Sequence, residues 1–128
     1  MTQESSRTLS RKLLVKVTCG ADDAERLSQA LTVAATAVAS GVDVSLWLTG
    51  DATWLAVPGR VPDLGLEGAA PLSDLVDAVL AGGRTTACTQ CVARRGITAA
   101  DVAPGVRIAG AASFLEEALA DDVQALVY

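Results

Sequence analysis

A chain of 128 residues has the length of one domain and can bury a core without disulfide or metal cross-links. Its residues are 51% hydrophobic and 20% charged, a balance that excludes an intrinsically disordered chain. The net charge of −5 argues against binding to nucleic acids or membrane surfaces, because both attract basic patches.

The first half of the chain predicts a strand followed by a helix. Residues 1–11 are polar and are interpreted as a disordered tail ahead of a single domain at 12–128. A β-branched apolar run at 12–18 predicts a buried strand. From residue 24 to 40, apolar side chains recur every three or four positions, as in a helix with one buried face. Either of the two preceding aspartates suits its N-cap, and Gly41 stands where a left-handed cap is expected.

The rest of the chain repeats this alternation. Residues 42–48 predict a second strand, and the Gly- and Pro-rich segment 58–70 predicts a long surface loop. Pro71 suits the first turn of a helix that ends at Gly82 and Gly83. The later elements are a strand at 84–88, a short helix at 89–95, a strand at 106–109, a helix at 112–120 and a strand at 123–127. This order predicts an α/β fold, a three-layer α/β/α sandwich with a five-stranded parallel sheet.

The amino-acid composition excludes several kinds of catalytic and metal-binding site. The chain has no histidine, which excludes a histidine-based catalytic triad and any histidine-containing metal site. Its three cysteines are one short of a Cys₄ zinc site, and no phosphate-binding glycine motif follows a strand. We therefore expect neither a metal nor another cofactor. An odd number of cysteines suits a reducing cytoplasm better than a secreted disulfide framework.

All three thiols are expected at the carboxyl ends of strands, where the functional crevice of an open parallel sheet lies. Cys19 follows the first strand, Cys88 ends the third and Cys91 begins the next helix. The helix N-terminus and the cationic Arg94 and Arg95 favour a thiolate at Cys91. Cys91 is therefore the expected nucleophile, and Cys88 is placed to resolve a persulfide or a mixed disulfide.

Each of these residues also has a structural interpretation. Cys19 suits a small apolar side chain at a strand end. Arg94 and Arg95 suit solvated charges at a helix C-terminus. Trp54 either lines the crevice, anchors a subunit contact or packs in the core.

Four segments carry a resemblance to a known family through their order and spacing. They are LLVKVT at 13–18, VDVSLWLTGD at 42–51, CVARRGI at 91–97 and GAASFL at 110–115. Together they resemble the DsrE/DsrF-like (YchN-like) family, which includes the sulfur-relay subunit TusD, over residues 13–128. The resemblance implies a YchN-like α/β domain that assembles into trimers or hexamers. It also implies a persulfide on a cysteine before the Arg-Gly segment, a position that Cys91 matches.

The resulting hypothesis is a cytoplasmic sulfur carrier, transferase-like if active, that forms a persulfide on Cys91 with Cys88 as accessory. Its partners would be sulfur donor and acceptor proteins. Two alternatives stay open: an oligomeric binding module with structural cysteines, and a C-x-x-C thiol-disulfide oxidoreductase. The latter lacks a cis-proline loop unless Pro104 supplies it. Partly exposed Leu64, Leu66 and Trp54 predict a homo-oligomer.

Overall fold

A computed structural model describes residues 11–128, so the expected tail at 1–11 lies outside the described residues except for its last residue. The five expected strands form one sheet, with every neighbouring pair parallel and the order β4-β3-β2-β1-β5. Their bounds are β1 (Lys12–Val17), β2 (Asp43–Leu48), β3 (Arg84–Cys88), β4 (Arg107–Ala109) and β5 (Val123–Val127). The predicted five-stranded parallel sheet is therefore confirmed.

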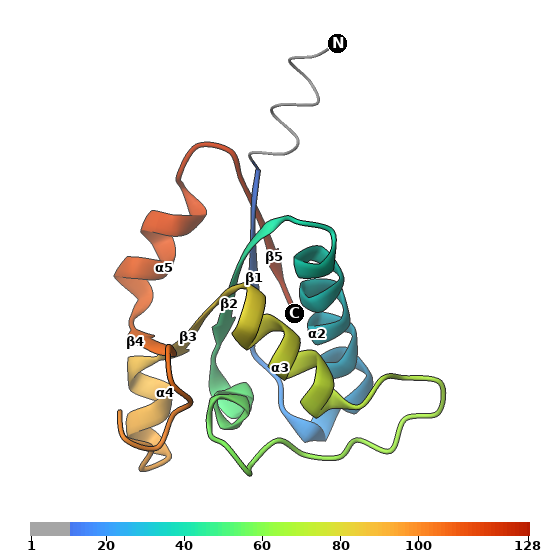
Figure 1. The fold of residues 1–128 in the computed structure, drawn as a ribbon. Helices are drawn as coiled ribbons and strands as arrows, with labels where there is room; N and C mark the ends of the chain where they lie inside the picture. The colour runs from blue at the N-terminus through green and yellow to red at the C-terminus, as the bar shows by residue number, and fades with distance from the viewer. Residues whose placement is uncertain (1–10) are drawn as a thin grey trace.

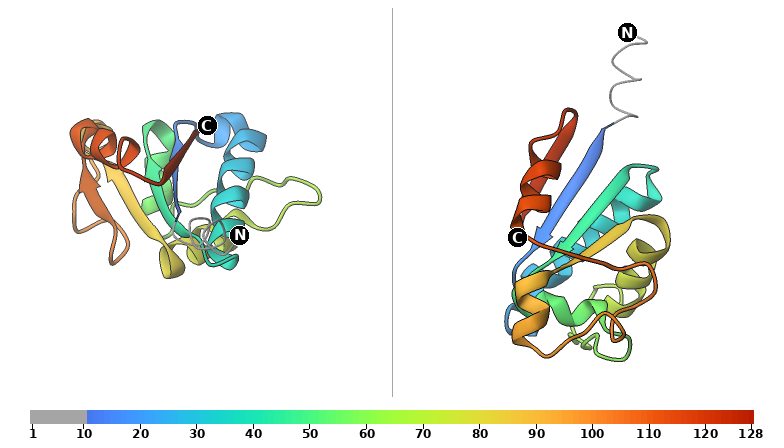
Figure 2. Two further views of the ribbon diagram at one scale, coloured as in Figure 1. Left: turned by 90° about the horizontal axis from the view of Figure 1, so that it is seen from above. Right: turned by 90° about the vertical axis from the view of Figure 1, so that its left-hand side faces the viewer.

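Helices cover both faces of this sheet, as Figures 1 and 2 show. The α-helices are α2 (Ala24–Ala39), α3 (Leu72–Gly82), α4 (Thr89–Arg94) and α5 (Ala111–Ala118), and the 3₁₀ helices are η1 (Ala21–Asp23) and η2 (Gly50–Ala56). Helices α2 and α3 lie on one face and α5 lies on the other, which makes the three-layer sandwich. The short η1, η2 and α4 follow β1, β2 and β3 at the carboxyl edge of the sheet.

The face under α2 and α3 holds the apolar core. The buried stripe of α2 is built from leucine and alanine, and the small alanines allow the helix to approach the sheet closely. Its members with no exposed surface are Leu27, Ala30, Leu31 and Ala34. They pack on strand residues such as Val15, Val44 and Leu46. Gly41 has the expected left-handed conformation, with φ of 82°.

The start of α2 differs from the expectation of a side-chain cap. Asp23 occupies the N-cap position but makes no capping hydrogen bond. The Oδ1 of Asp22 instead accepts the N–H of Gly20 at 3.1 Å, because η1 turns the chain before the α-helix begins. Pro71 likewise lies one position earlier than expected, at the N-cap of α3.

The opposite face holds the buried Trp47 beside polar side chains, and one carboxylate from α5 connects these groups. Glu117 accepts hydrogen bonds from Ser45 Oγ at 2.6 Å and from Trp47 Nε1 at 3.1 Å. It also pairs with Arg107 and, at 3.7 Å, with Lys12 Nζ. Glu117 thus joins α5 to strands β1, β2 and β4. In the described part of the chain, 11–128, no helix is long and apolar enough to cross a membrane.

Candidate functional site

The C-x-x-C pair lies where β3 passes directly into α4. Cys88 is both the last residue of β3 and the N-cap of α4, and Cys91 is the third helical residue. The expectation that Cys91 is nearer the helix start is therefore wrong. No linker separates strand from helix, so the last strand residue has to serve as the cap.

The environment of Cys88 favours its thiolate, and the pKa of its thiol is lowered. Burial alone would raise this pKa. The sulfur, however, lies against the N–H groups of Cys91 and Gln90 and the thiol of Cys91, and together these outweigh the burial. None of the N–H groups makes a full capping hydrogen bond, so they act as partial positive charges at the helix start. Cys88 is also partly exposed to solvent, whereas Cys91 is buried.

Cys91 points into the contact between α4 and η2. Its side chain is only 9% exposed, and its Sγ accepts the N–H of Gly50 at 3.2 Å. Gly50 has a left-handed φ of 54°, and an added Cβ would lie 2.8 Å from the carbonyl oxygen of Thr18. Glycine is therefore required where η2 begins, and this turn directs a donor at the Cys91 sulfur.

The two arginines of the segment have different positions. Arg95 donates from Nε and Nη2 to Asp51 Oδ1, at 3.1 and 2.8 Å, and from Nη1 to the carbonyl oxygen of Cys91 at 3.1 Å. It therefore connects α4 to the start of η2. Arg94 is exposed, as the alternative of a solvated charge at the helix end predicts. Neither arginine is among the main causes of the lowered pKa of Cys88.

The cation that does act on Cys88 comes from β1 and was missed by sequence reasoning. The positive charge of Lys16 lowers the pKa of the Cys88 thiol. The register pairs Lys16 with Trp47, and Trp47 with a residue two positions before Cys88, so all three lie on one face of the sheet. The amine of Lys16 lies 4.8 Å from the ring centroid of Phe114, which itself packs edge-on to Trp47. Only the pairing of strands brings this lysine near the thiol.

The remaining predicted residues lie apart from the pair. Cys19 is partly exposed beside the start of α2, and burial, followed by the negative charge of Asp23, raises its pKa. The main causes of this shift do not include either of the other two thiols. Trp54 is half-buried in η2, with the guanidinium of Arg60 over its ring at 4.1 Å. Among residues 11–128, no group of three or more potential ligands could hold a metal ion.

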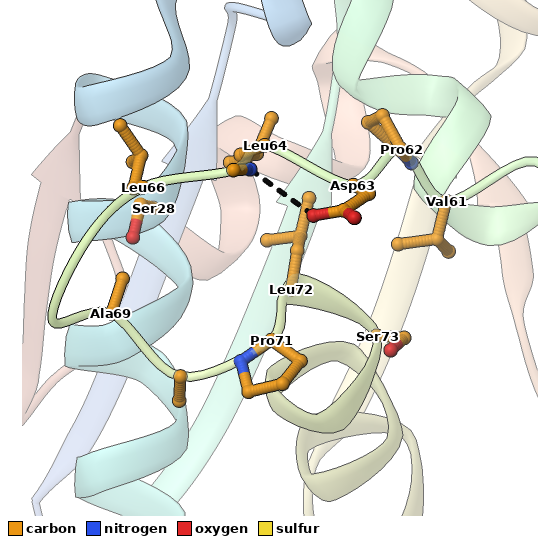
Figure 3. Close-up of a pocket in the computed structure, with 12 residues that line it drawn as sticks. Ser28, Val61, Pro62, Asp63, Leu64, Leu66, Ala69, Pro71, Leu72 and Ser73 are labelled. Carbon is orange, nitrogen blue, oxygen red and sulfur yellow. Dashed lines mark hydrogen bonds between the residues drawn. The ribbon is translucent and has the colours of Figure 1, made fainter.

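Two cavities adjoin the segment that follows η2. One, of about 300 Å³, lies at the carboxyl ends of β1 and β2 and is lined by Asp22, Asp51, Trp54 and Arg60 among others. The other, of about 350 Å³, lies between the loop before α3 and the two helices α2 and α3, as Figure 3 shows. Its lining is polar and apolar in similar measure, and the carboxylate of Asp63 accepts the N–H of Gly65. It contains neither a cysteine nor a cation, so it offers no chemistry to the thiols.

Comparison with known proteins agrees with this architecture. The model of the DsrE/DsrF-like family matches residues 11–124. The chain is similar in structure to the YchN protein of E. coli, with a TM-score of 0.76, 22% identity, and coverage of 92% of this chain and 99% of that one. It is also similar to MTH1491, a protein of unknown function from Methanobacterium thermoautotrophicum, with a TM-score of 0.69, 12% identity and the same coverage. No curated protein matches the sequence.

Proposed function

Because the chain belongs to the DsrE/DsrF-like family, we propose that it is a sulfur carrier that holds sulfane sulfur as a persulfide on its C-x-x-C pair. The observation that carries this proposal is the partly exposed Cys88, whose lowered pKa makes it the readier nucleophile. The two cysteines must be reduced to carry sulfur, and the cytoplasm is a reducing compartment that would keep them so. The family supports the general class of function, and the persulfide chemistry and its residues are our proposal.

The geometry favours an exchange of the roles that the sequence suggested. Cys91 was the expected carrier of the persulfide, but it is buried and its sulfur is occupied by the N–H of Gly50. Cys88 has the exposure and the stabilised thiolate that an attacking group needs. We therefore assign the first attack to Cys88 and the resolving role to Cys91.

Transfer takes two displacements. The Cys88 thiolate attacks the outer sulfur of a donor persulfide, the donor's S–S bond breaks, and its electron pair leaves on the donor thiolate. The new Cys88 persulfide then gives its outer sulfur to an acceptor thiolate, which restores the Cys88 thiolate. The N–H groups of α4 and the charge of Lys16 favour the anion at each stage.

The closeness of Cys91 to Cys88 favours a second outcome. Attack by the Cys91 thiolate on the inner sulfur of the persulfide would form a Cys88–Cys91 disulfide and expel hydrosulfide. An external thiol would then have to reduce the disulfide. This route makes the chain a sulfide-releasing oxidoreductase, and the interaction of the Cys91 thiol with the Cys88 sulfur is the observation in its favour.

A loading experiment tests the proposal. The protein is incubated with a cysteine desulfurase and L-cysteine, and tryptic peptides are examined by mass spectrometry for the added mass of one sulfur atom. We expect loading at Cys88 in the wild type, abolished in Cys88→Ser, unchanged in the control Cys19→Ser, and longer-lived in Cys91→Ser. Equal loading of Cys88→Ser and the wild type would contradict the assignment. Loading of no variant, while a known carrier loads, would favour the binding-module alternative.

We also propose that the chain forms a homo-oligomer. The expected contact residues Leu64, Leu66 and Trp54 are all partly exposed. The large apolar side chains that are most exposed lie elsewhere, on and after α5 and on the edge strand β5: Leu115 at 56%, Leu119 at 75% and Val127 at 64%. Burial of this second set between chains would remove an apolar surface from water. Sedimentation of a monomer at micromolar concentration would contradict the proposal.

A further inference from the structure

The cavity of about 300 Å³ at the carboxyl ends of β1 and β2 carries charges of both signs on one small surface. Arg60 stands on one of its walls, and Asp22 and Asp51 come from the turns that follow β1 and β2. We propose that this cavity binds a small zwitterion of the amino-acid or short-peptide type. The carboxylate of this ligand pairs with Arg60, and the ammonium group of the ligand lies between Asp22 and Asp51.

Arg60 is positioned to receive a carboxylate. Its guanidinium lies over the ring of Trp54, with the central carbon 4.1 Å from the ring centroid. Stacking of this kind uses the face of the guanidinium and leaves its N–H edge available for a planar, two-point bond to a carboxylate. Within residues 11–128, no hydrogen bond or ion pair occupies that edge, and Arg60 is exposed.

The carboxylates of Asp22 and Asp51 each use only one oxygen atom in hydrogen bonds within residues 11–128. Asp22 uses Oδ1 to accept the N–H of Gly20, and Asp51 uses Oδ1 to accept two bonds from Arg95. In the described part of the chain, neither Oδ2 atom has a hydrogen-bond partner, so both oxygens are available to an ammonium group. Gly20 makes this arrangement possible, because a Cβ at that position would lie 2.5 Å from the Cβ of Asp51.

The position and size of the cavity limit the ligand. Open parallel sheets bind ligands outside the carboxyl ends of their strands, and this cavity lies at that edge. Its volume is at the lower end of the range for small-molecule sites, roughly 300–1,000 Å³, so it suits a molecule of amino-acid size. The partly exposed apolar ring of Trp54 can cover the ligand's hydrocarbon part.

This site also touches the segment that holds the buried thiol. Asp51 lines the cavity, and the residue before it, Gly50, donates its N–H to Cys91 Sγ. Zwitterion binding goes beyond the proposed sulfur transfer and does not depend on it. Its test therefore uses ligands without a free thiol, so that failure of binding and failure of sulfur loading are separate results.

Calorimetric titration of the full chain with S-methylcysteine tests the inference. Two matched ligands each lack one charge: S-methylcysteine amide lacks the carboxylate, and 3-(methylthio)propionate lacks the ammonium group. We expect saturable binding of the zwitterion and at least about tenfold weaker binding of each single-charge ligand, as expected for the loss of a charged hydrogen bond. Equal affinity for all three, or no saturable binding of S-methylcysteine, would overturn the proposal.

Protein variants test the same charged contacts by changing the protein instead of the ligand. Arg60→Gln should weaken the binding of S-methylcysteine about tenfold. It should leave the affinity for S-methylcysteine amide unchanged, because that ligand has no carboxylate. Asp22→Asn should weaken the binding of S-methylcysteine. It should not weaken the binding of 3-(methylthio)propionate, which has no ammonium group. The control Arg84→Gln removes an exposed arginine at the opposite, amino-terminal end of β3 and should change nothing. An equal loss in Arg60→Gln and Arg84→Gln would show a nonspecific charge effect and overturn the site. Quenching of tryptophan fluorescence gives a second readout, because Trp54 lines the cavity.

Discussion

Replacement of Glu117 by glutamine should destabilise the protein by removing the charge that joins α5 to the sheet. The carboxylate is 10% exposed and receives bonds from Ser45, Trp47 and Arg107, with Lys12 at 3.7 Å. A carboxamide of the same shape keeps one acceptor oxygen but puts an NH₂ group where the second oxygen stood. The arginine bond then loses its ionic character, and one donor faces another donor.

The expected magnitude follows from these contacts. A hydrogen bond to a charged group stabilises a protein by roughly 1.5–3 kcal/mol, against about 0.5–1.5 kcal/mol for a neutral one. The partly exposed lysine pair adds a few tenths of a kcal/mol. Glu117→Gln should therefore lower the free energy of unfolding by about 2 kcal/mol at pH 7. In a chain of 128 residues this loss lowers Tm by roughly 6–10 °C.

Urea unfolding and thermal melts measure this loss, with Glu116→Gln as the control. Glu116 is the preceding residue of α5 and is exposed, so its variant should stay within about 0.5 kcal/mol of the wild type. The two substitutions make the same change in net charge on the same helix. A Glu117→Gln variant as stable as Glu116→Gln would refute the reasoning.

The pH dependence adds a second check. Burial alone would raise the pKa of Glu117, but the bonds from Ser45, Arg107 and Trp47 hold it below its ordinary value of 4.5. A carboxylate with a lowered folded-state pKa adds stability above its unfolded value and loses it as pH falls through the folded value. The difference between wild type and Glu117→Gln should therefore be full at pH 7 and should shrink below pH 4.5. A constant difference down to pH 3 would contradict the account.

Two further predictions concern the pKa of Cys88 and the two left-handed glycines Gly41 and Gly50. Lys16→Gln should raise the pKa of Cys88, whereas Arg94→Gln should leave it unchanged. The pH dependence of alkylation at peptide resolution measures this pKa. Equal shifts in the two variants would contradict the role of Lys16. Gly41→Ala should cost about 1–2 kcal/mol of unfolding free energy for its left-handed φ alone, because its site is open. Gly50→Ala should cost at least about 1 kcal/mol more in urea unfolding, since its Cβ meets a backbone oxygen at 2.8 Å. Equal costs would show that this contact is relieved easily.

Much of the fold is readable from local pattern. The apolar period of α2 and the β-branched runs of β1 and β2 each predict one element, and strict alternation then leaves a parallel sheet as the arrangement. The glycine after α2 marks its end by backbone conformation alone. The same reasoning brings Cys19, Cys88 and Cys91 to one edge, because each follows or ends a strand.

The chemistry of the pair was harder to predict because it depends on contacts distant in sequence. Lys16 reaches Cys88 only through the side-by-side pairing of β1, β2 and β3. Arg95 meets Asp51 across 44 positions, which diverts it from the sulfur atoms that its sequence position suggested. Which cysteine lies nearer the helix start depends on whether a linker separates β3 from α4, a distinction of two or three residues that periodicity does not resolve.

Alkylation of the three thiols in the native wild-type protein, followed site by site across pH, tests the central claim most directly. Cys88 should react first and should begin to react below the ordinary thiol pKa of 9.0, while Cys19, with its raised pKa, should lag behind it. Modification of buried Cys91 ahead of Cys88, or equal rates at Cys19 and Cys88, would contradict the account.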